Sequence, residues 1–300
     1  MEVLRVYTRG RKKQLFDMKI RYSTFLNNAY YEQFLVLYKS FLLYEHKHPF
    51  RVYSWDILDD DRIQYLKDIG VEVITVEQGD WDRLTYFGLY GFKWKGLLES
   101  DCDIEVLLDC DTIFLDNLDD IVDMYKGYDL IVVPEHVNKH KVGNLFNIGF
   151  MVYGKEGKHL LQKSVQRMLD QPSRGNNTPN TEMFSLCDIV EEEKSNVLEL
   201  PYMEYMHLWH NHSLKKTLSI KDGKFIVENE DGSRVRFYHF TTHIDPFEGN
   251  TVLRFSYDPK TTNRMWLKRF NNPIGLIYNH IDINEDFKTI NERQEQWLIK

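Results

Sequence analysis

Apolar and polar residues alternate in short blocks along the first eighty residues, and longer blocks with helical spacing lie between them. The strand-like blocks cover residues 2–10, 20–28, 50–57 and 71–77, and the helix-like blocks cover 29–46 and 59–70. An alternation of strand and helix is typical of βαβ units. The pattern therefore predicts an α/β fold in which helices flank a mainly parallel sheet.

The same pattern continues through the middle of the chain and loosens after Pro246. Residues 81–100 are rich in aromatic side chains, and their pattern predicts a helix towards the end of the segment. Further strands are predicted at 104–111, 129–135, 145–154, 196–201 and 234–242, and further helices at 119–127, 155–172 and 181–194. We therefore expect one α/β domain over residues 1–250, followed by a C-terminal extension over 251–300 that packs on it or forms part of its binding surface.

The composition indicates a globular chain with a sizeable core, because 42% of its 300 residues are apolar. The formal net charge of -8 argues against general nucleic-acid binding, which needs a basic surface. The three cysteines form no Cys-x-x-Cys pair, which favours a reducing compartment. The sequence shows neither an apolar leader nor an apolar run of membrane-spanning length, so we expect a cytoplasmic protein.

The tripeptide Asp-Cys-Asp occurs twice within eleven residues, at 101–103 and at 109–111. The first copy precedes the apolar run 104–108, and we interpret it as a solvated turn. The second copy follows that run, at the carboxyl end of a strand, where open α/β sheets bind their ligands. Residues i and i+2 of an extended stretch share a face, so Asp109 and Asp111 should converge on one Mg²⁺ or Mn²⁺ ion.

The block around the second copy, "EVLLDCDTIFLDN", resembles the metal-binding strand of GT-A glycosyltransferases, in particular family 8 and glycogenin-like enzymes. The segment "FNIGFMVY" is similar to that family's Phe-Asn-Ser-Gly strand. The segment "FYHFTTHIDPFEG" resembles its His-Phe-x-Gly-x-x-Lys-Pro-Trp motif. The resemblance implies a GT-A fold, a bound Mn²⁺ (or Mg²⁺) and a nucleoside diphosphate sugar as donor, with a UDP-sugar favoured by analogy.

Residue by residue, the resemblance implies a metal and sugar site drawn from distant segments. Asp109, Asp111 and His239 would be the metal ligands. Asn147 would contact the donor sugar, and Gly149 would let the backbone approach the donor closely. Without the resemblance, His239 would be interpreted as an ordinary strand histidine.

The resemblance also assigns roles around the nucleotide and the reacting sugar. Asn28 and Tyr30 would contact the nucleobase and ribose, and Lys93 would bind phosphate. Glu182 would border the reacting face of the sugar, as a group that stabilises positive charge there.

Two departures from the family motif concern the segment after His239. Thr242 stands where a glycine is expected, and Asp245 stands where the family has a lysine that neutralises the diphosphate. Loss of that lysine removes a charge-assisted contact to the leaving group. Arg254 and Lys260 are candidate substitutes.

The predicted function is metal-dependent transfer of a sugar, with retention of configuration, to a hydroxyl of a glycan, lipid or protein. The alternatives are a catalytically inactive nucleotide-sugar-binding module and a nucleotidyltransferase on a related fold. A haloacid-dehalogenase-type phosphatase is disfavoured, because Thr112 comes one residue too early for its motif. The basic and aromatic segment 263–280 is interpreted as a surface helix, with peripheral membrane contact as the alternative.

One further cluster carries a weaker signal. The residues His207, His210 and His212 have a spacing that resembles a metal cluster, but they lack partners at zinc spacing, which favours a surface loop.

Overall fold

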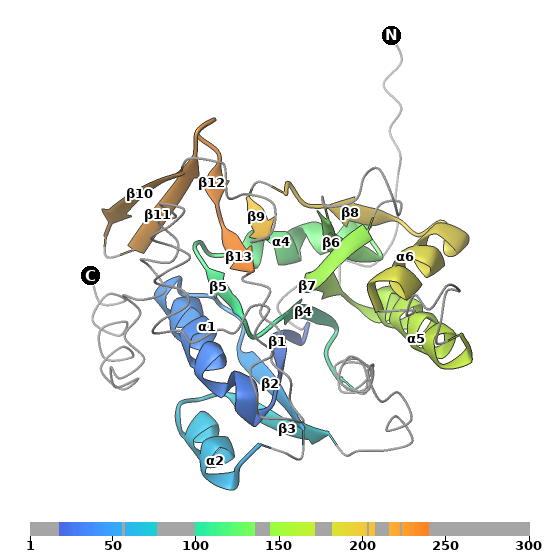
Figure 1. Cartoon of the computed structure of the whole chain (residues 1–300), viewed down its shortest axis with the longest axis horizontal. Coiled ribbons are helices and arrows are strands. Elements are labelled where there is room, and N and C mark those ends of the chain that lie inside the picture. Colours follow the sequence, from blue (N-terminus) through green and yellow to red (C-terminus); the bar gives the residue numbers. More distant parts are fainter. Residues whose placement is uncertain are drawn as a thin grey trace.

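The computed structural model describes residues 18–55, 58–76, 100–135, 145–171, 182–202, 204–207, 216–222 and 224–239 (Figure 1). Several predictions fall outside these residues and are untested. They are the strand at 2–10, the helix within 81–100 and the extension 251–300.

A seven-stranded sheet with the order β3-β2-β1-β4-β7-β6-β8 forms the centre of the molecule. Its strands are β1 (Ile20–Leu26), β2 (Phe50–Trp55), β3 (Glu72–Val76), β4 (Ile104–Leu108), β6 (Leu130–Glu135), β7 (Leu145–Tyr153) and β8 (Val197–Glu199). Among these strands only β7 runs antiparallel to its neighbours. The prediction of a mainly parallel sheet is confirmed, and the carboxyl ends of β1 and β4 lie at the same edge.

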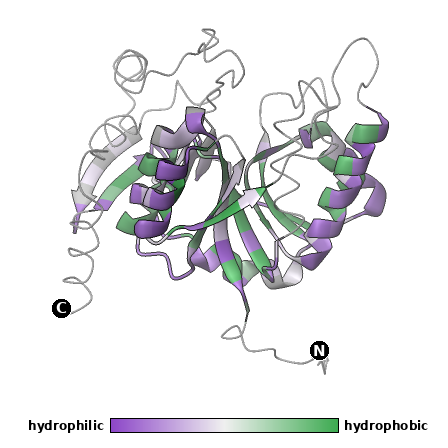
Figure 2. Cartoon of the chain, turned by 90° about the horizontal axis from the view of Figure 1, so that it is seen from below, coloured by the Kyte–Doolittle hydropathy of each residue, from purple (hydrophilic) through white to green (hydrophobic). Residues whose placement is uncertain are grey.

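Helices cover both faces of this sheet (Figure 1). The described helices are α1 (Tyr31–Leu43), α2 (Asp60–Asp68), α4 (Asp119–Met124), α5 (Lys155–Asp170) and α6 (Glu182–Glu193), with 3-10 turns η2 (Asn28–Tyr30) and η4 (Tyr125–Gly127). The core contact clusters place α1 against one face and α5 and α6 against the other. Figure 2 shows the apolar sides of these helices turned towards the strands.

Strand β4 shows why the sheet is buried on both faces. Val106 and Leu108 pack into the cluster that contains α1, whereas Leu107 packs into the cluster that contains α5 and α6. All three side chains are almost fully buried, and burial of each stabilises the fold by about 1.5–3 kcal/mol. The apolar run 106–108, with side chains buried on both faces, is therefore the mark of a central strand.

Two small sheets extend the domain beyond the central one. The first joins β5 (Thr112–Phe114), β13 (Phe237–His239) and β9 (Tyr205–His207). The second joins β10 (Lys216–Lys221), β11 (Lys224–Asn229) and β12 (Arg234–Val235). The strand predicted over 234–242 was therefore wrong in extent, because its described part is split between the two sheets. Strands β5, β9, β10 and β11 were not predicted.

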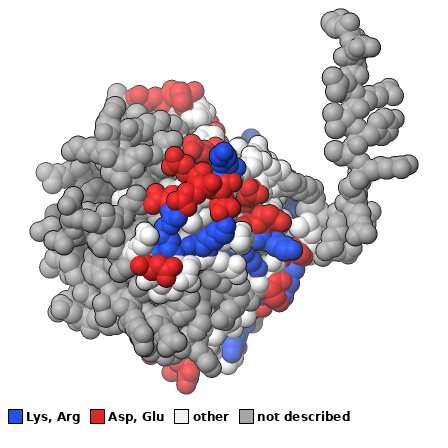
Figure 3. Space-filling view, turned by 90° about the vertical axis from the view of Figure 1, so that its right-hand side faces the viewer, with Lys and Arg blue, Asp and Glu red and all other residues white. Residues whose placement is uncertain are grey.

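The outer surface of α5 and α6 carries interleaved charges (Figure 3). Lys163 pairs with Glu193 at 2.5 Å, and Arg167 pairs with both Glu192 and Asp188. Exposed pairs of this kind contribute little each, so they align the two helices more than they stabilise them. None of the described helices has the length and apolarity that crossing a bilayer requires.

Candidate metal centre

The second Asp-Cys-Asp copy forms a tight turn between β4 and β5. The hydroxyl of Thr112 donates a hydrogen bond to the carbonyl of Asp109 at 2.6 Å, which closes this turn. Our expectation of an extended stretch was therefore wrong in its geometry. The two carboxylates converge because the backbone folds back at Cys110, which is itself buried.

Strand β13 brings the histidine to this turn. It pairs antiparallel with β5, and the register places His239 opposite Thr112, next to Asp111. The backbone ladder thus fixes a residue more than a hundred positions away in the sequence beside the acidic pair. On its other side β13 pairs parallel with β9, where His207 is in register with His239. His210 and His212 lie outside the described residues.

Ligand atoms of Asp109, Asp111 and His239 all lie within 4.8 Å of one another. The His239 Nε2 atom is 3.1 Å from Oδ1 of Asp111 and 3.5 Å from Oδ2 of Asp109. The Asp111 and His239 side chains are largely buried, whereas the Asp109 side chain is 30% exposed. The Asp109 carboxylate is therefore the most accessible of the three candidate ligands.

This donor set fits a hard divalent cation. An octahedral ion about 2.1 Å from each ligand holds neighbouring ligand atoms about 3 Å apart, close to the 3.1 Å and 3.5 Å between His239 Nε2 and the two carboxylates. Two carboxylate oxygens with one imidazole nitrogen suit Mn²⁺ or Mg²⁺ better than a thiolate-seeking metal. The two carboxylates both carry negative charge at this point, and a cation held between them and the imidazole offsets their mutual repulsion.

Two residues of β7, Asn147 and Gly149, lie next to the His239 imidazole. The backbone N–H of Gly149 donates to Oδ1 of Asn147 at 2.8 Å, and Nδ1 of His239 lies 3.2 Å from the same oxygen. The backbone N–H of Asp109 donates to the carbonyl of Gly149 at 3.0 Å. Because β7 runs antiparallel to β4, its first half extends past the end of β4 and reaches the metal cluster.

The residues predicted to bind the nucleotide lie at the same edge of the sheet, after β1. The Asn28 side chain donates to Asp59 at 2.9 Å and accepts from the Asp59 backbone at 3.1 Å. Arg62 donates to the backbone carbonyl of Asn28 at 2.9 Å and lies over the ring of Tyr31. Tyr30 ends η2, and its backbone N–H donates to Asn27. These contacts order the loop, and the nucleotide role stays a prediction.

The remaining predicted residues are either outside the metal cluster or outside the described residues. Glu182 is buried at the start of α6, outside the group of three metal-ligating side chains. Lys93, Thr242 and Asp245 lie outside the described residues, as do Arg254 and Lys260. Their roles stay predictions.

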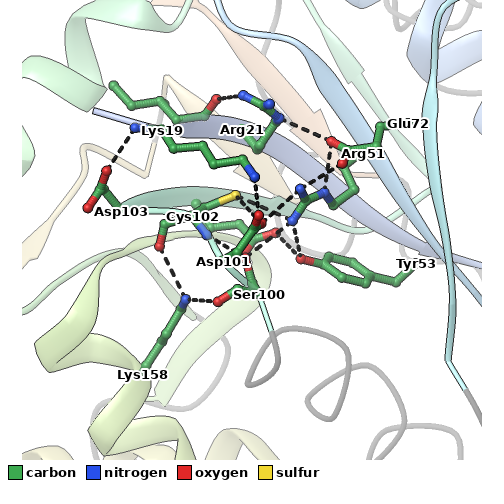
Figure 4. Close-up of polar contacts among 12 residues, drawn as sticks. Lys19, Arg21, Arg51, Tyr53, Glu72, Ser100, Asp101, Cys102, Asp103 and Lys158 are labelled. Carbon is green, nitrogen blue, oxygen red and sulfur yellow. Dashed lines mark hydrogen bonds and ion pairs between the residues drawn. The ribbon is translucent and has the colours of Figure 1, made fainter. Parts of the chain in front are cut away.

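The first Asp-Cys-Asp copy lies at the opposite edge of the sheet, before β4 (Figure 4). Asp101 pairs with Lys19 and with the buried guanidinium of Arg51, the latter at 3.0 Å. The hydrogen bond from Lys19, followed by that from Arg51, lowers the pKa of Asp101 to about 2. Asp103 accepts a hydrogen bond from the Lys19 backbone at 2.8 Å. This copy is therefore an ion-paired turn that joins strand ends.

Sequence reasoning missed Arg236, which holds β13 in place. Its guanidinium donates to Asp120 at 2.7 and 2.9 Å, to the carbonyl of Asn117 at 2.6 Å and to the Tyr205 hydroxyl at 2.9 Å. The signal was present, because a single arginine between the apolar residues Val235 and Phe237 implies a partner for its charge.

The fold is similar to that of the GT-A glycosyltransferases. Among solved structures, the glycosyltransferase GlyE of Streptococcus pneumoniae TIGR4 is similar with a TM-score of 0.55 and 14% identity, over 93% of this chain and 64% of the GlyE chain. The galactosyltransferase LgtC, in complex with donor and acceptor sugar analogues, is similar with a TM-score of 0.54 and 12% identity, over 83% of this chain and 95% of LgtC. An active-site mutant of LgtC gives a TM-score of 0.54 with 13% identity, over 85% and 95% of the two chains.

These similarities confirm the predicted α/β GT-A fold. This chain spans less than two thirds of the GlyE chain. Its sequence matches no protein-family profile and no curated protein sequence.

Proposed function

We propose that the chain is a divalent-metal-dependent glycosyltransferase. It transfers a sugar from a nucleoside diphosphate sugar, with UDP as the favoured nucleotide, to a hydroxyl of a glycan, lipid or protein. The glycosidic bond between the transferred sugar and the acceptor forms with retention of anomeric configuration, as in the family 8 enzymes that the sequence resembles. Mn²⁺ is the favoured metal and Mg²⁺ the alternative.

One observation carries this proposal. Asp109, Asp111 and His239 converge at the carboxyl ends of the strands of a GT-A-like sheet, where a ligand of an open α/β fold binds. The first Asp-Cys-Asp copy has the same composition but forms ion pairs at the other edge. Position in the fold, and not the motif alone, therefore favours the second copy.

Each residue has a defined task in the proposed reaction. A bound divalent ion would stabilise negative charge on the departing diphosphate as a Lewis acid. Asp109, Asp111 and His239 would hold that ion, and Lys93 would contact phosphate. Glu182 is the candidate for stabilising positive charge on the sugar, because the transition state of glycosyl transfer is oxocarbenium-like.

The residues after β1 would hold the nucleoside part of the donor. Tyr30 and Asn28 follow the carboxyl end of β1, and β1 is adjacent and parallel to β4. A donor whose diphosphate lies on the metal would extend its nucleoside along this edge. The contacts of Asn28 with Asp59 and Arg62 would fix the loop that receives it.

The test is a panel of nucleotide sugars with and without Mn²⁺, read by thermal shift and by release of nucleoside diphosphate. A ligand present at about a hundred times its Kd stabilises the native state by about 2.7 kcal/mol, so binding should raise the melting temperature. We expect one nucleotide sugar to bind only with metal and to be turned over. Binding without turnover would favour an inactive module, and release of pyrophosphate from a nucleoside triphosphate would favour a nucleotidyltransferase.

The two tripeptides provide a matched control. Asp109→Asn and Asp111→Asn remove a metal ligand and should weaken Mn²⁺ binding by about a hundredfold or more, with loss of turnover. Asp101→Asn and Asp103→Asn make the same change in the same tripeptide and should retain metal binding and turnover. Equal loss in both pairs, with all variants folded, would contradict the proposal.

A further inference from the structure

We propose that Asn147 is a positioning residue for His239. Its side-chain oxygen holds the imidazole in one orientation and in one tautomer, so that Nε2 presents its lone pair to the space between Asp109 and Asp111. This inference rests on the proposed metal site. It differs from the role in sugar contact that the family resemblance implies for Asn147.

The first step fixes the orientation of the Asn147 amide. The backbone N–H of Gly149 points at the Asn147 Oδ1 position from 2.8 Å. A backbone N–H can only donate, so the atom that faces it must be the carbonyl oxygen and not the amide nitrogen. The reverse orientation would set two donors against each other in a buried position.

The second step fixes the imidazole tautomer. Nδ1 of His239 lies 3.2 Å from that same oxygen, and the oxygen has two lone pairs and no proton to donate. Nδ1 must therefore carry a hydrogen. The Asp111 carboxylate, 3.1 Å from Nε2, can also only accept, so either a proton or a cation must lie between them. When a cation takes the place of that proton, the Nε2 lone pair faces the cation.

The third step concerns how firmly the arrangement is held. Asn147 and Gly149 belong to the same strand, so the acceptor and its backbone donor share one rigid element. Asn147 and His239 are both buried, at 7% and 8% exposure, which leaves little room for the ring to rotate. A hydrogen-bonded partner of this kind is what orients a histidine ligand in metal sites generally.

The test compares Asn147→Ala with Asn147→Asp, using Mn²⁺ alone as the probe and the paramagnetic resonance signal of free Mn²⁺ as the readout. Removal of the acceptor should weaken Mn²⁺ binding by about ten- to a hundredfold. The aspartate offers oxygens to both donors and should restore the affinity to within a few-fold of the original chain. Ile148→Val is the matched control on the same strand, because Ile148 packs on the opposite face, and it should leave the affinity unchanged.

A second measurement reads the tautomer directly and needs no turnover. The protein is labelled with ¹⁵N-histidine and studied by NMR with saturating Mg²⁺, a diamagnetic ion, and the His239→Gln variant identifies the signal. We expect a protonated Nδ1 and an unprotonated Nε2 in the original chain, and a mixed population in Asn147→Ala.

The opposite tautomer in the original chain, or unchanged Mn²⁺ affinity in a folded Asn147→Ala variant, would overturn the inference. If Asn147→Ala does not fold, the tautomer in the original chain and the affinity of Asn147→Asp still decide. Absence of sugar transfer alongside the expected tautomer and Mn²⁺ results would count against the proposed function and leave this inference intact.

Discussion

The imidazole of His239 lies directly against the backbone of Gly149. A Cβ atom at position 149 would be 2.3 Å from Cε1 of His239 and 2.4 Å from its Nδ1, distances that side chains do not tolerate. The absence of a side chain at this position is thus a condition for the histidine to reach the acidic pair. The predicted role of Gly149 in admitting the donor stays a prediction, and the structure shows that Gly149 admits the imidazole of a candidate metal ligand.

We therefore expect Gly149→Ala to displace the imidazole. Mn²⁺ affinity should fall at least about tenfold, because a ligand held out of place is lost to the metal. Overpacking should also lower the free energy of unfolding by about 1–3 kcal/mol. Gly127→Ala is the control, since no atom lies within 4 Å of a Cβ built there. A folded Gly149→Ala protein that binds Mn²⁺ normally would show that the ring has another way to fit.

Arg236 gives a prediction about stability. Its planar guanidinium bonds at once to Asp120, to the Asn117 carbonyl and to the Tyr205 hydroxyl, a fork that lysine cannot reproduce. Arg236→Lys should lower the free energy of unfolding by about 1–3 kcal/mol in urea denaturation. Arg234→Lys is the control, because Arg234 is more exposed and its contacts are longer, at 3.4 and 3.5 Å. Equal effects of both changes would argue against a special stabilising role of the Arg236 hydrogen bonds.

His46 gives a prediction about pH. Burial lowers the pKa of His46 to about 4, while its Nδ1 bonds to the Phe41 carbonyl and its Nε2 accepts from the Leu118 backbone. In the unfolded chain the pKa is about 6.5, so the unfolded state binds more protons between these values. The contribution to stability is full above about pH 6.5 and is lost as the pH falls towards 4, by on the order of 3 kcal/mol.

The measurement is the free energy of unfolding in urea across this pH range, for the original chain and for His46→Gln. The variant cannot gain a proton at this position, so its stability should fall less steeply on acidification. Parallel curves for the two proteins would assign the acid sensitivity to other groups.

Most of the central sheet follows from the sequence, because all of its strands except the three-residue β8 are long enough to show their own periodicity. The helix predicted over 29–46 corresponds to α1 with its preceding 3-10 turn, and the run 104–108 is β4. Strands of three residues, such as β5 and β9, carry no periodic signal. They form because the ladder with β13 pairs them, which is information about the folded chain.

The sequence predicted which residues form the candidate metal site, but not the hydrogen bonds between them. The resemblance selected Asp109, Asp111 and His239, which the structure brings together. It did not indicate that Asn147 contacts the histidine, because that contact depends on β7 running antiparallel past the end of β4. The strand register determines which hydrogen bonds the Asn147 amide makes, and a local sequence pattern does not predict the register.

The order of these pieces along the chain has a consequence for protein synthesis. Every strand of the central sheet ends at or before Glu199, whereas the third candidate ligand is His239. A chain emerges from the ribosome amino end first, so the sheet can assemble while that histidine is still in the exit tunnel. A nascent or prematurely terminated chain that ends before His239 would accordingly have a folded central sheet but only two of the three candidate metal ligands.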